Sequence, residues 1–291
     1  MIPEINFERV DELIALAISE DLGDLGDTTT QAVIPAGMAA VAVLKAKEEC
    51  VCAGLPVAAR VFAKLDRSIT FNAMVNEGDL CQPGTVMARI SGPARALLAA
   101  ERTALNFLQR LCGVATTAHK YAQALSGTNT KILDTRKTTP GYRNLEKYAV
   151  AVGGATNHRI GLFDRIMIKD NHRELAGLEG AGGIARSVAR AREMYPQLEV
   201  EVEADNLSEV AEALEANADY ILLDNMSDEM MAEAVKMNNR RAKLEASGGI
   251  TLERLPRIGK IGVDFVSAGA LTHSVKAADI SMDILPEESN A

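Results

Sequence analysis

The chain has 291 residues, 47% apolar and 24% charged, so it can bury a substantial core and lacks the composition of a disordered protein. At about 150 residues per domain, this length predicts roughly two domains. A net charge of −9 and 4% aromatic residues without tryptophan argue against nucleic-acid binding, and the apolar runs are too short for a membrane span. The four cysteines show no zinc spacing and favour a reduced cytoplasm, and the acidic N-terminus does not resemble a signal peptide.

Charge is distributed unevenly along this acidic chain. Residues 131–173 hold nine lysines and arginines but only four acids. Such a concentrated basic stretch indicates a site for a small anion, whereas a solvated basic surface is the alternative. Several of these residues flank predicted buried strands, which favours the site.

In the N-terminal part, residues 4–20 have helical apolar spacing, and Asp27 with the threonines 28–30 predicts a loop. Short β-like runs follow at 39–48, 68–75 and 85–91, with turn signals at 76–79 and 82–84. These hairpins are similar to those of lipoyl and biotinyl carriers, but no lysine lies between Lys64 and Lys120 to carry a modification. Residues 93–125 predict one or two long helices, begun by the Ser91–Pro93 signal and broken at Gly113.

After residue 128, short apolar runs alternate with helical patterns. The predicted strands are 131–135, 165–171, 198–204, 220–225, 243–249 and 264–270, and the helices between them are 144–154, 183–195, 207–216, 228–239 and 251–258. This alternation predicts a parallel sheet built from βαβ units. With a seventh strand near 152–160, the pattern favours an incomplete (β/α) barrel over a closed barrel of eight strands.

Polar and glycine residues end nearly every predicted strand, where a barrel builds its active site. The cations Arg136, Lys137, His158, Arg159 and Lys169 suit a ligand with several carboxylates or phosphates. The acids Glu203 and Asp224 suit Mg²⁺ held through a diphosphate, or a developing cationic carbon. Backbone N–H groups of the glycine loops Ser247-Gly248-Gly249 and Ser267-Ala268-Gly269 suit a phosphate. Together these groups indicate glycosyl-type transfer at a sugar phosphate.

Structural roles remain open for neighbouring residues. Glu199 and Glu201 alternate with Glu203, so they are expected to be solvated or structurally paired. Asp134 is expected to anchor the basic pair that follows it, and Asn225 to cap a helix. His119 and His273 are assigned structural roles, whereas the role of His172 is left open.

Several segments carry a family resemblance. These are ERTALN (101–106), DTRKTTPG (134–141), GGATNHRIGLFD (153–164) and IKDNH (168–172), followed in order by EVEVE, LLDN, SGGI and SAGALT. Together they resemble quinolinate phosphoribosyltransferase over about residues 8–285. The resemblance implies that quinolinate and 5-phosphoribosyl-1-diphosphate react with Mg²⁺ to give nicotinate mononucleotide, diphosphate and CO₂, in de novo NAD synthesis.

The resemblance also implies site roles. Lys137, Glu203 and Asp224 would be catalytic, and the two acids would reach the metal indirectly, through diphosphate. The implied substrate-binding residues are Arg102, Thr135, Arg136, Lys137, His158, Arg159, Lys169, Glu203, Asp224, Ser247, Gly248, Gly249, Ser267, Ala268 and Gly269. Arg102 would enter the site of a partner subunit, which implies a homodimer or a higher oligomer built from it.

The implied fold is an N-terminal α/β sandwich, residues 1–112 joined by the tail 276–291, and an incomplete α/β barrel at 113–275. Loop 177–183 is expected to be mobile and to cover the site. Three alternatives stay open: a paralogue associated with molybdenum transport, a nicotinate phosphoribosyltransferase, and a carrier or scaffold protein. The full set of cations, excessive for a monocarboxylate, disfavours the first two. The clustered strand-end chemistry disfavours the third.

Overall fold

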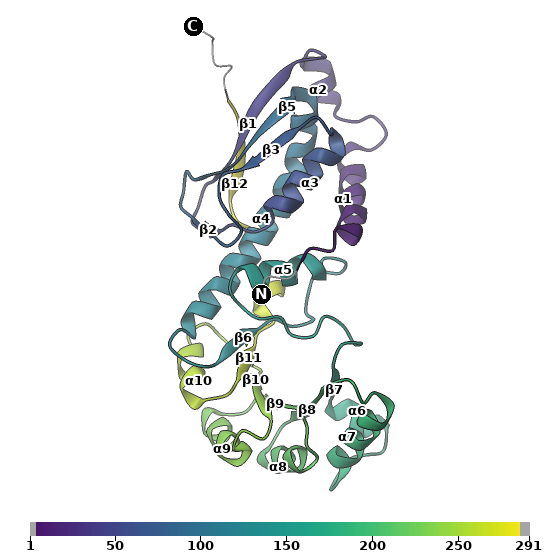
Figure 1. The fold of residues 1–291 in the computed structure, drawn as a ribbon, viewed down its shortest axis with the longest axis vertical. Coiled ribbons are helices and arrows are strands. Elements are labelled where there is room, and N and C mark those ends of the chain that lie inside the picture. The colour runs from purple at the N-terminus through teal and green to yellow at the C-terminus, as the bar shows by residue number, and fades with distance from the viewer. Residues whose placement is uncertain (1–3, 286–291) are drawn as a thin grey trace. The chain divides into compact units, whose positions relative to one another are not determined.

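A computed structural model describes residues 4–285, and within them no helix is long and apolar enough to cross a membrane. The chain divides into two compact units (Figure 1). The first comprises the residues up to His119, Thr139–Gly154 and the chain from Leu271 onward; the second comprises Lys120–Thr138 and Ala155–Ala270. The 112/113 boundary expected from the sequence falls inside a helix. The ends of the expected first domain, residues 1–3 and 286–291, lie outside the described part.

An antiparallel sheet in the order β12-β1-β5-β3 forms the centre of the first unit. Its strands are β1 (Ala39–Ala46), β3 (Thr70–Ala73), β5 (Val86–Pro93) and β12 (Ile280–Ile284), and a small ladder joins β2 (Cys50–Val51) to β4 (Leu80–Cys81). The last strand therefore returns to pair with the first, with Ala42 opposite Ile284. The predicted β runs 39–48, 68–75 and 85–91 all contain a strand.

Helices of the first unit follow the predictions in part. α1 (Phe7–Leu22) agrees with its amphipathic pattern. The loop predicted at 27–30 is wrong, because the Asp27 side chain accepts from the Thr30 backbone N–H at 2.9 Å and caps α2 (Thr28–Val33). α3 (Leu55–Leu65), which was not predicted, begins at Gly54 with φ +103° and buries Val57, Val61 and Phe62.

The long helix α4 (Ala94–Ala124) corrects two expectations. Its start is not capped by Ser91, since residues 91–93 belong to β5, where Pro93 lies opposite Ala39. Gly113 does not break the helix. A Cβ there would lie 2.2 Å from the carbonyl oxygen of Lys276, so the glycine allows close backbone contact. α5 (Arg143–Val152) belongs to the same unit, and its buried Glu146 pairs with Arg110 of α4 at 2.5 Å.

The second unit contains a parallel sheet in the order β6-β11-β10-β9-β8-β7. The strands are β6 (Lys131–Leu133), β7 (Ile166–Ile168), β8 (Val200–Ala204), β9 (Tyr220–Asp224), β10 (Lys243–Ser247) and β11 (Phe265–Ser267). All six predicted strands are confirmed. A parallel bridge between Leu133 and Thr156 occupies the expected seventh position, and no closed barrel forms among the described strands.

Helices follow the strands along the outside of the curved sheet (Figure 1). They are α6 (Asp170–Leu175), α7 (Gly183–Met194), α8 (Leu207–Glu215), α9 (Asp228–Asn238), α10 (Leu255–Ile261) and the short α11 (Ala270–His273), which ends in the first unit. Successive helices α7, α8, α9 and α10 contact one another. This arrangement leaves the carboxyl ends of the strands along one rim.

We predict that Gly113→Ala destabilises the protein although alanine favours helices. The added methyl group must displace the Lys276 backbone, and such overpacking costs about 1–3 kcal/mol. Urea titration would measure the free energy of unfolding. Asn106→Ala, at an exposed position of α4, is the control and should be neutral or slightly stabilising. Equal stability of the two variants would contradict the close contact at Gly113.

Candidate active site

The register of the parallel strands brings the predicted site residues to one rim. Ser247 lies opposite Asp224, and Ser267 lies opposite Leu133, next to Asp134. Glu203 is the fourth residue of β8, and Lys169 follows β7 directly. The polar strand ends, separated in sequence, therefore share one edge of the sheet, as expected for a barrel.

Asp134 anchors the segment that carries the basic residues 158 and 159. Its carboxylate is fully buried and accepts from the His158 backbone N–H at 2.7 Å and from Asn157 Nδ2 at 2.8 Å. The basic pair Arg136 and Lys137 follows Asp134 after one residue. Asp134 was expected to anchor this basic pair, whereas the contacts of its side chain hold the 157–158 segment.

His158 lies inside the barrel, with 8% of its surface exposed, between two buried carboxylates. Its Nε2 is 3.3 Å from Glu201 Oε2 on β8 and 3.2 Å from Glu245 Oε2 on β10. Burial opposes a charged ring, whereas the two carboxylates favour one. Burial also raises the pKa of Glu245. Neither carboxylate partner was predicted as a site residue.

Arg159 and Arg136 are the half-buried guanidinium groups of the site. Arg159 donates to the carbonyl oxygen of Arg165 at 2.9 Å, beside the edge strand β7, and to Met167 Sδ. Burial and the nearby charge of Arg136 lower the pKa of Arg159, while Glu201 opposes this shift. Among residues 4–285 no carboxylate forms an ion pair with Arg159, so its charge can serve a bound anion.

Acids and one lysine occupy the ends of β7, β8 and β9. Lys169 forms an ion pair with Glu203, whose side chain is 12% exposed. Burial, together with the charges of Glu209, Asp224 and Asp170, raises the pKa of Asp205 just after β8. This oxygen-rich group has the donor chemistry that Mg²⁺ prefers, and it adds Asp170 and Asp205 to the predicted acids.

The Ser247-Gly248-Gly249 loop packs against the end of β9. Gly248 has φ +86°, and a Cβ there would lie 2.0 Å from Asn225 Oδ1, so only glycine fits. Asn225 has φ +53°, and its backbone N–H donates to Ser247 O at 2.9 Å. Asn225 therefore fixes this loop and does not cap α9, where the cap is Ser227.

Arg254 is a cation near this loop that sequence reasoning missed. It donates to the carbonyl oxygens of Gly248 and Met226 and pairs with Asp228 at 2.8 Å. Arg254 follows Gly249 by five residues in the sequence, so sequence proximity alone does not reveal the contact. The contact depends on the turn that precedes α10.

The Ser267-Ala268-Gly269 loop is partly committed to the barrel. The Ala268 N–H donates to Leu133 O at 3.0 Å, and Ser267 is buried at the end of β11. These two residues therefore support the sheet, and the phosphate prediction for this loop depends on Gly269.

The remaining predicted residues lie as follows. Lys137 is exposed, and its N–H donates to Thr135 Oγ1 at 3.1 Å. Arg102 is exposed on α4 in the first unit, and its predicted role requires a second copy of the chain. His172 Nδ1 accepts from the Lys169 N–H at 2.9 Å and caps α6. Loop 177–183 contains the buried Leu178, but its mobility stays a prediction.

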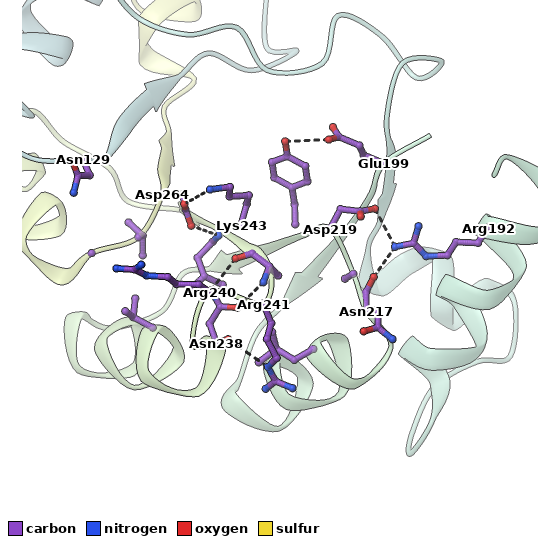
Figure 2. Close-up of a pocket in the computed structure, with 18 residues that line it drawn as sticks. Asn129, Arg192, Glu199, Asn217, Asp219, Asn238, Arg240, Arg241, Lys243 and Asp264 are labelled. Atoms are coloured by element: carbon purple, nitrogen blue, oxygen red, sulfur yellow. Dashed lines mark hydrogen bonds and ion pairs between the residues drawn. The ribbon is translucent and has the colours of Figure 1, made fainter. Parts of the chain in front are cut away.

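A cavity of about 1040 Å³ lies at the opposite, amino end of β8–β11 (Figure 2). Its charged groups largely pair with one another, including Arg192 with Asp219 at 3.1 Å and Lys243 with Asp264 at 2.9 Å. None of the predicted site residues lines it. In barrels this end supports stability, whereas function lies at the carboxyl ends.

An incomplete parallel α/β barrel with cations, acids and glycine loops on its carboxyl rim defines a protein that handles phosphate-bearing anions. Residues 27–112 match the family model for the N-terminal domain, and residues 114–283 the C-terminal domain, of quinolinate phosphoribosyl transferase. The chain belongs to the quinolinate phosphoribosyltransferase family.

Individual relatives agree. The chain is 42% identical over 291 residues to quinolinate phosphoribosyltransferase [decarboxylating] 1b of Nicotiana tabacum, covering 94% of this chain and 81% of that protein. It is 41% identical to the probable nicotinate-nucleotide pyrophosphorylase [carboxylating] of Bacillus subtilis, covering 96% and 95%. The solved NadC structure from Streptococcus pyogenes matches with a TM-score of 0.92 and 39% identity over 98% of this chain and all of that one (100%).

We predict that Asp134→Ala lowers both stability and activity. The variant leaves the buried His158 N–H without its acceptor, which costs roughly 1–3 kcal/mol. Thermal and urea unfolding would measure the loss. Glu193→Ala, an exposed acid of the same unit, serves as the control and should unfold like the unmodified protein. An Asp134 variant as stable as this control would show that Asp134 does not anchor the 157–158 segment.

Proposed function

We propose that this chain is an enzyme that transfers the phosphoribosyl group of 5-phosphoribosyl-1-diphosphate to quinolinate, with loss of CO₂, in de novo NAD synthesis. The products are nicotinate mononucleotide, diphosphate and CO₂. The observation that supports this most directly is the set of cations on one barrel rim, opposite acids and a glycine loop. The family membership of the chain supports the same reaction.

The cations bind the dicarboxylate in this proposal. Arg136, Arg159 and Lys169 neutralise and orient quinolinate, since guanidinium groups grip carboxylates bidentately. Arg159 is suited to this because it has no carboxylate partner in the described chain. Lys169 exchanges its contact with Glu203 for the substrate, which frees Glu203 for the ribose.

The acids and Lys137 act at the sugar. As diphosphate leaves, C1 of the ribose becomes cationic, and Glu203 and Asp224 stabilise that charge. Lys137, exposed at the rim, neutralises the departing diphosphate. The Ser247-Gly248-Gly249 loop and Gly269 hold the 5-phosphate. The quinolinate nitrogen then attacks C1 as the bond to diphosphate breaks. The adjacent carboxylate leaves as CO₂, the electron pair of the broken C–C bond stays on the ring carbon beside the positive nitrogen, and that carbon takes a proton from solvent to give nicotinate mononucleotide.

Mg²⁺ is part of the proposal, because Glu203, Asp224, Asp205 and Asp170 supply the oxygen donors that it prefers. Bound with the diphosphate, the ion would neutralise charge on the leaving group. The acids would reach it through the diphosphate and its water. The chain's residues otherwise act by positioning and neutralising, and the proposal needs no protein nucleophile.

A homodimer completes the proposed site through Arg102 of a second copy. Ile160, Leu162 and Phe163 follow Arg159 and are exposed by 47%, 72% and 73%. Such neighbouring apolar side chains at the edge of a polar site favour coverage by another subunit. The four free buried cysteines support a reduced, cytoplasmic setting.

The decisive assay measures CO₂ release and nicotinate mononucleotide formation from quinolinate, 5-phosphoribosyl-1-diphosphate and Mg²⁺, beside nicotinate as the competing substrate. We expect turnover with quinolinate alone. Turnover with nicotinate instead would overturn the proposed substrate. Inactivity with both substrates would favour the paralogue without this activity.

We predict that Arg136→Ala and Lys169→Ala each raise the KM for quinolinate by about tenfold or more, because a charge-assisted bond worth about 1.5–3 kcal/mol is lost. Steady-state kinetics with saturating 5-phosphoribosyl-1-diphosphate would measure this. Lys260→Ala, an exposed lysine on α10, is the matched control and should leave the KM unchanged. An unaltered KM for quinolinate in both site variants would refute the assignment of Arg136 and Lys169 to the quinolinate site.

We predict that inactive Arg102→Ala and Lys137→Ala variants regain activity when their subunits are mixed. A mixed dimer contains one site with both residues intact, so random mixing of equal amounts restores about a quarter of full activity. Co-refolding followed by the CO₂ assay measures the recovery. No recovery, with mixed dimers confirmed by mass spectrometry, would place Arg102 in its own subunit's site or outside any site.

A further inference from the structure

The buried cluster of His158, Glu201 and Glu245 has a geometry that the order of the strands in the sheet creates. Glu201 lies on β8 and Glu245 on β10, with β9 between them. Strands two positions apart are separated by roughly 9.6 Å. The long glutamate side chains cover this separation, so both carboxylates lie within 3.3 Å of one imidazole nitrogen. The two acids therefore converge inside the barrel, beneath the carboxyl rim, with 0% and 1% of their surfaces exposed.

Hydrogen bonding at the other ring nitrogen assigns the ring proton. His158 Nδ1 lies 2.7 Å from the Arg159 backbone nitrogen and accepts its N–H in the neutral ring. In that form the single ring proton is on Nε2, on the side of the two carboxylates. An Nε2 that bears hydrogen has no lone pair for a metal ion. Arg165 also lies 3.6 Å from Glu201. Its guanidinium supplies the positive charge that a metal ion would otherwise bring to this carboxylate. The cluster is thus built to hold an imidazole N–H.

This arrangement connects the barrel interior to the proposed quinolinate site. The two carboxylates lie within ion-pair distance of Nε2, and on the other side of the ring Nδ1 contacts the backbone N–H of Arg159. The carboxylate of Asp134 holds the backbone of His158 itself. The Arg159 side chain starts from this backbone, and its guanidinium donates to the carbonyl oxygen of Arg165 and to Met167 Sδ.

We propose that Glu201 and Glu245 are positioning residues for quinolinate recognition, acting through His158 to place Arg159. The inference rests on the proposed function, but it concerns residues that do not touch the substrate. Loss of one carboxylate leaves the ring free to rotate, and the 2.7 Å bond to the Arg159 N–H is then lost. The expected defect is weaker quinolinate binding, with the phosphoribosyl side of the site preserved.

The test is Glu245→Gln, which keeps the side-chain volume and removes the charge. We expect the quinolinate KM to rise by about tenfold, with the KM for 5-phosphoribosyl-1-diphosphate changed less than about twofold. A merely structural defect lowers the fraction of active protein, which reduces kcat and leaves both KM values unaltered. Glu199→Gln, next to β8 and in contact with Arg165 but not with His158, is the matched control and should keep both values.

A double-mutant cycle identifies the route. If Glu245 acts through His158, His158→Gln combined with Glu245→Gln raises the quinolinate KM no further than His158→Gln alone. Additive effects would overturn the proposal, as would a rise in both KM values. Should Glu245→Gln fail to fold, Glu201→Gln tests the same relation at the same nitrogen.

Two controls separate this inference from its alternatives. Turnover of quinolinate by the unmodified enzyme tests the proposed function independently, so an inactive parent protein refutes that function and an active one leaves only the positioning role in question. Elemental analysis of the purified parent and Glu245→Gln proteins tests for a metal. One equivalent of a transition metal in the parent protein that is absent from the variant would show that the cluster is a metal site and would overturn the positioning role.

Discussion

The register of six parallel strands is the constraint on which the site depends. Parallel pairing aligns the carboxyl ends, so Asp224 lies opposite Ser247 and Ser267 lies opposite the residue before Asp134. A shift of one residue in any strand would turn its side chains to the other face of the sheet. Glu201 and Glu245 would then leave the barrel interior, and His158 would lose both of its carboxylate contacts.

Before any substrate binds, the cations on the rim of the barrel repel one another. Arg136 and Arg159 are close enough for one to lower the pKa of the other. Glu201, beneath them, opposes this effect, and it also contacts Arg165. Because a buried charge without a partner costs several kcal/mol, the acids and bases of the barrel interior must be retained together. The interior of the barrel is therefore an ionic support for the rim as well as an apolar core.

The sequence was sufficient to predict the parts of the fold and site that depend on local pattern. Each of the six predicted strands is present, because apolar runs ending in polar residues mark buried parallel strands. Asp134 was expected to be an anchor, since it follows such a run. The family resemblance extended these predictions to the reaction.

The errors and omissions have long-range causes. Asp27 was assigned to a loop because the same residue types favour turns and helix caps, and only the structure shows the cap of α2. Gly113 is required by the Lys276 backbone, which is distant in sequence. Glu245 lies within a correctly predicted strand, but its partners come from β8 and from residue 158. The order of the strands in the sheet, which no local pattern encodes, brings them together.

The proposed site has one half for the sugar and diphosphate and another half for the 5-phosphate. Closely packed residues connect the two halves. Asn225, one residue past β9, holds the backbone of Ser247, and its side chain fills the space that a Cβ at Gly248 would need. We proposed Asp224, beside Asn225, for the sugar and diphosphate half, and the glycines for the 5-phosphate half. The distance between these two halves is thus set by packing between neighbouring strands. For a reaction that relies on positioning and charge neutralisation, such fixed spacing is what the protein must provide, because a displacement of about 1 Å can reduce the rate a hundredfold.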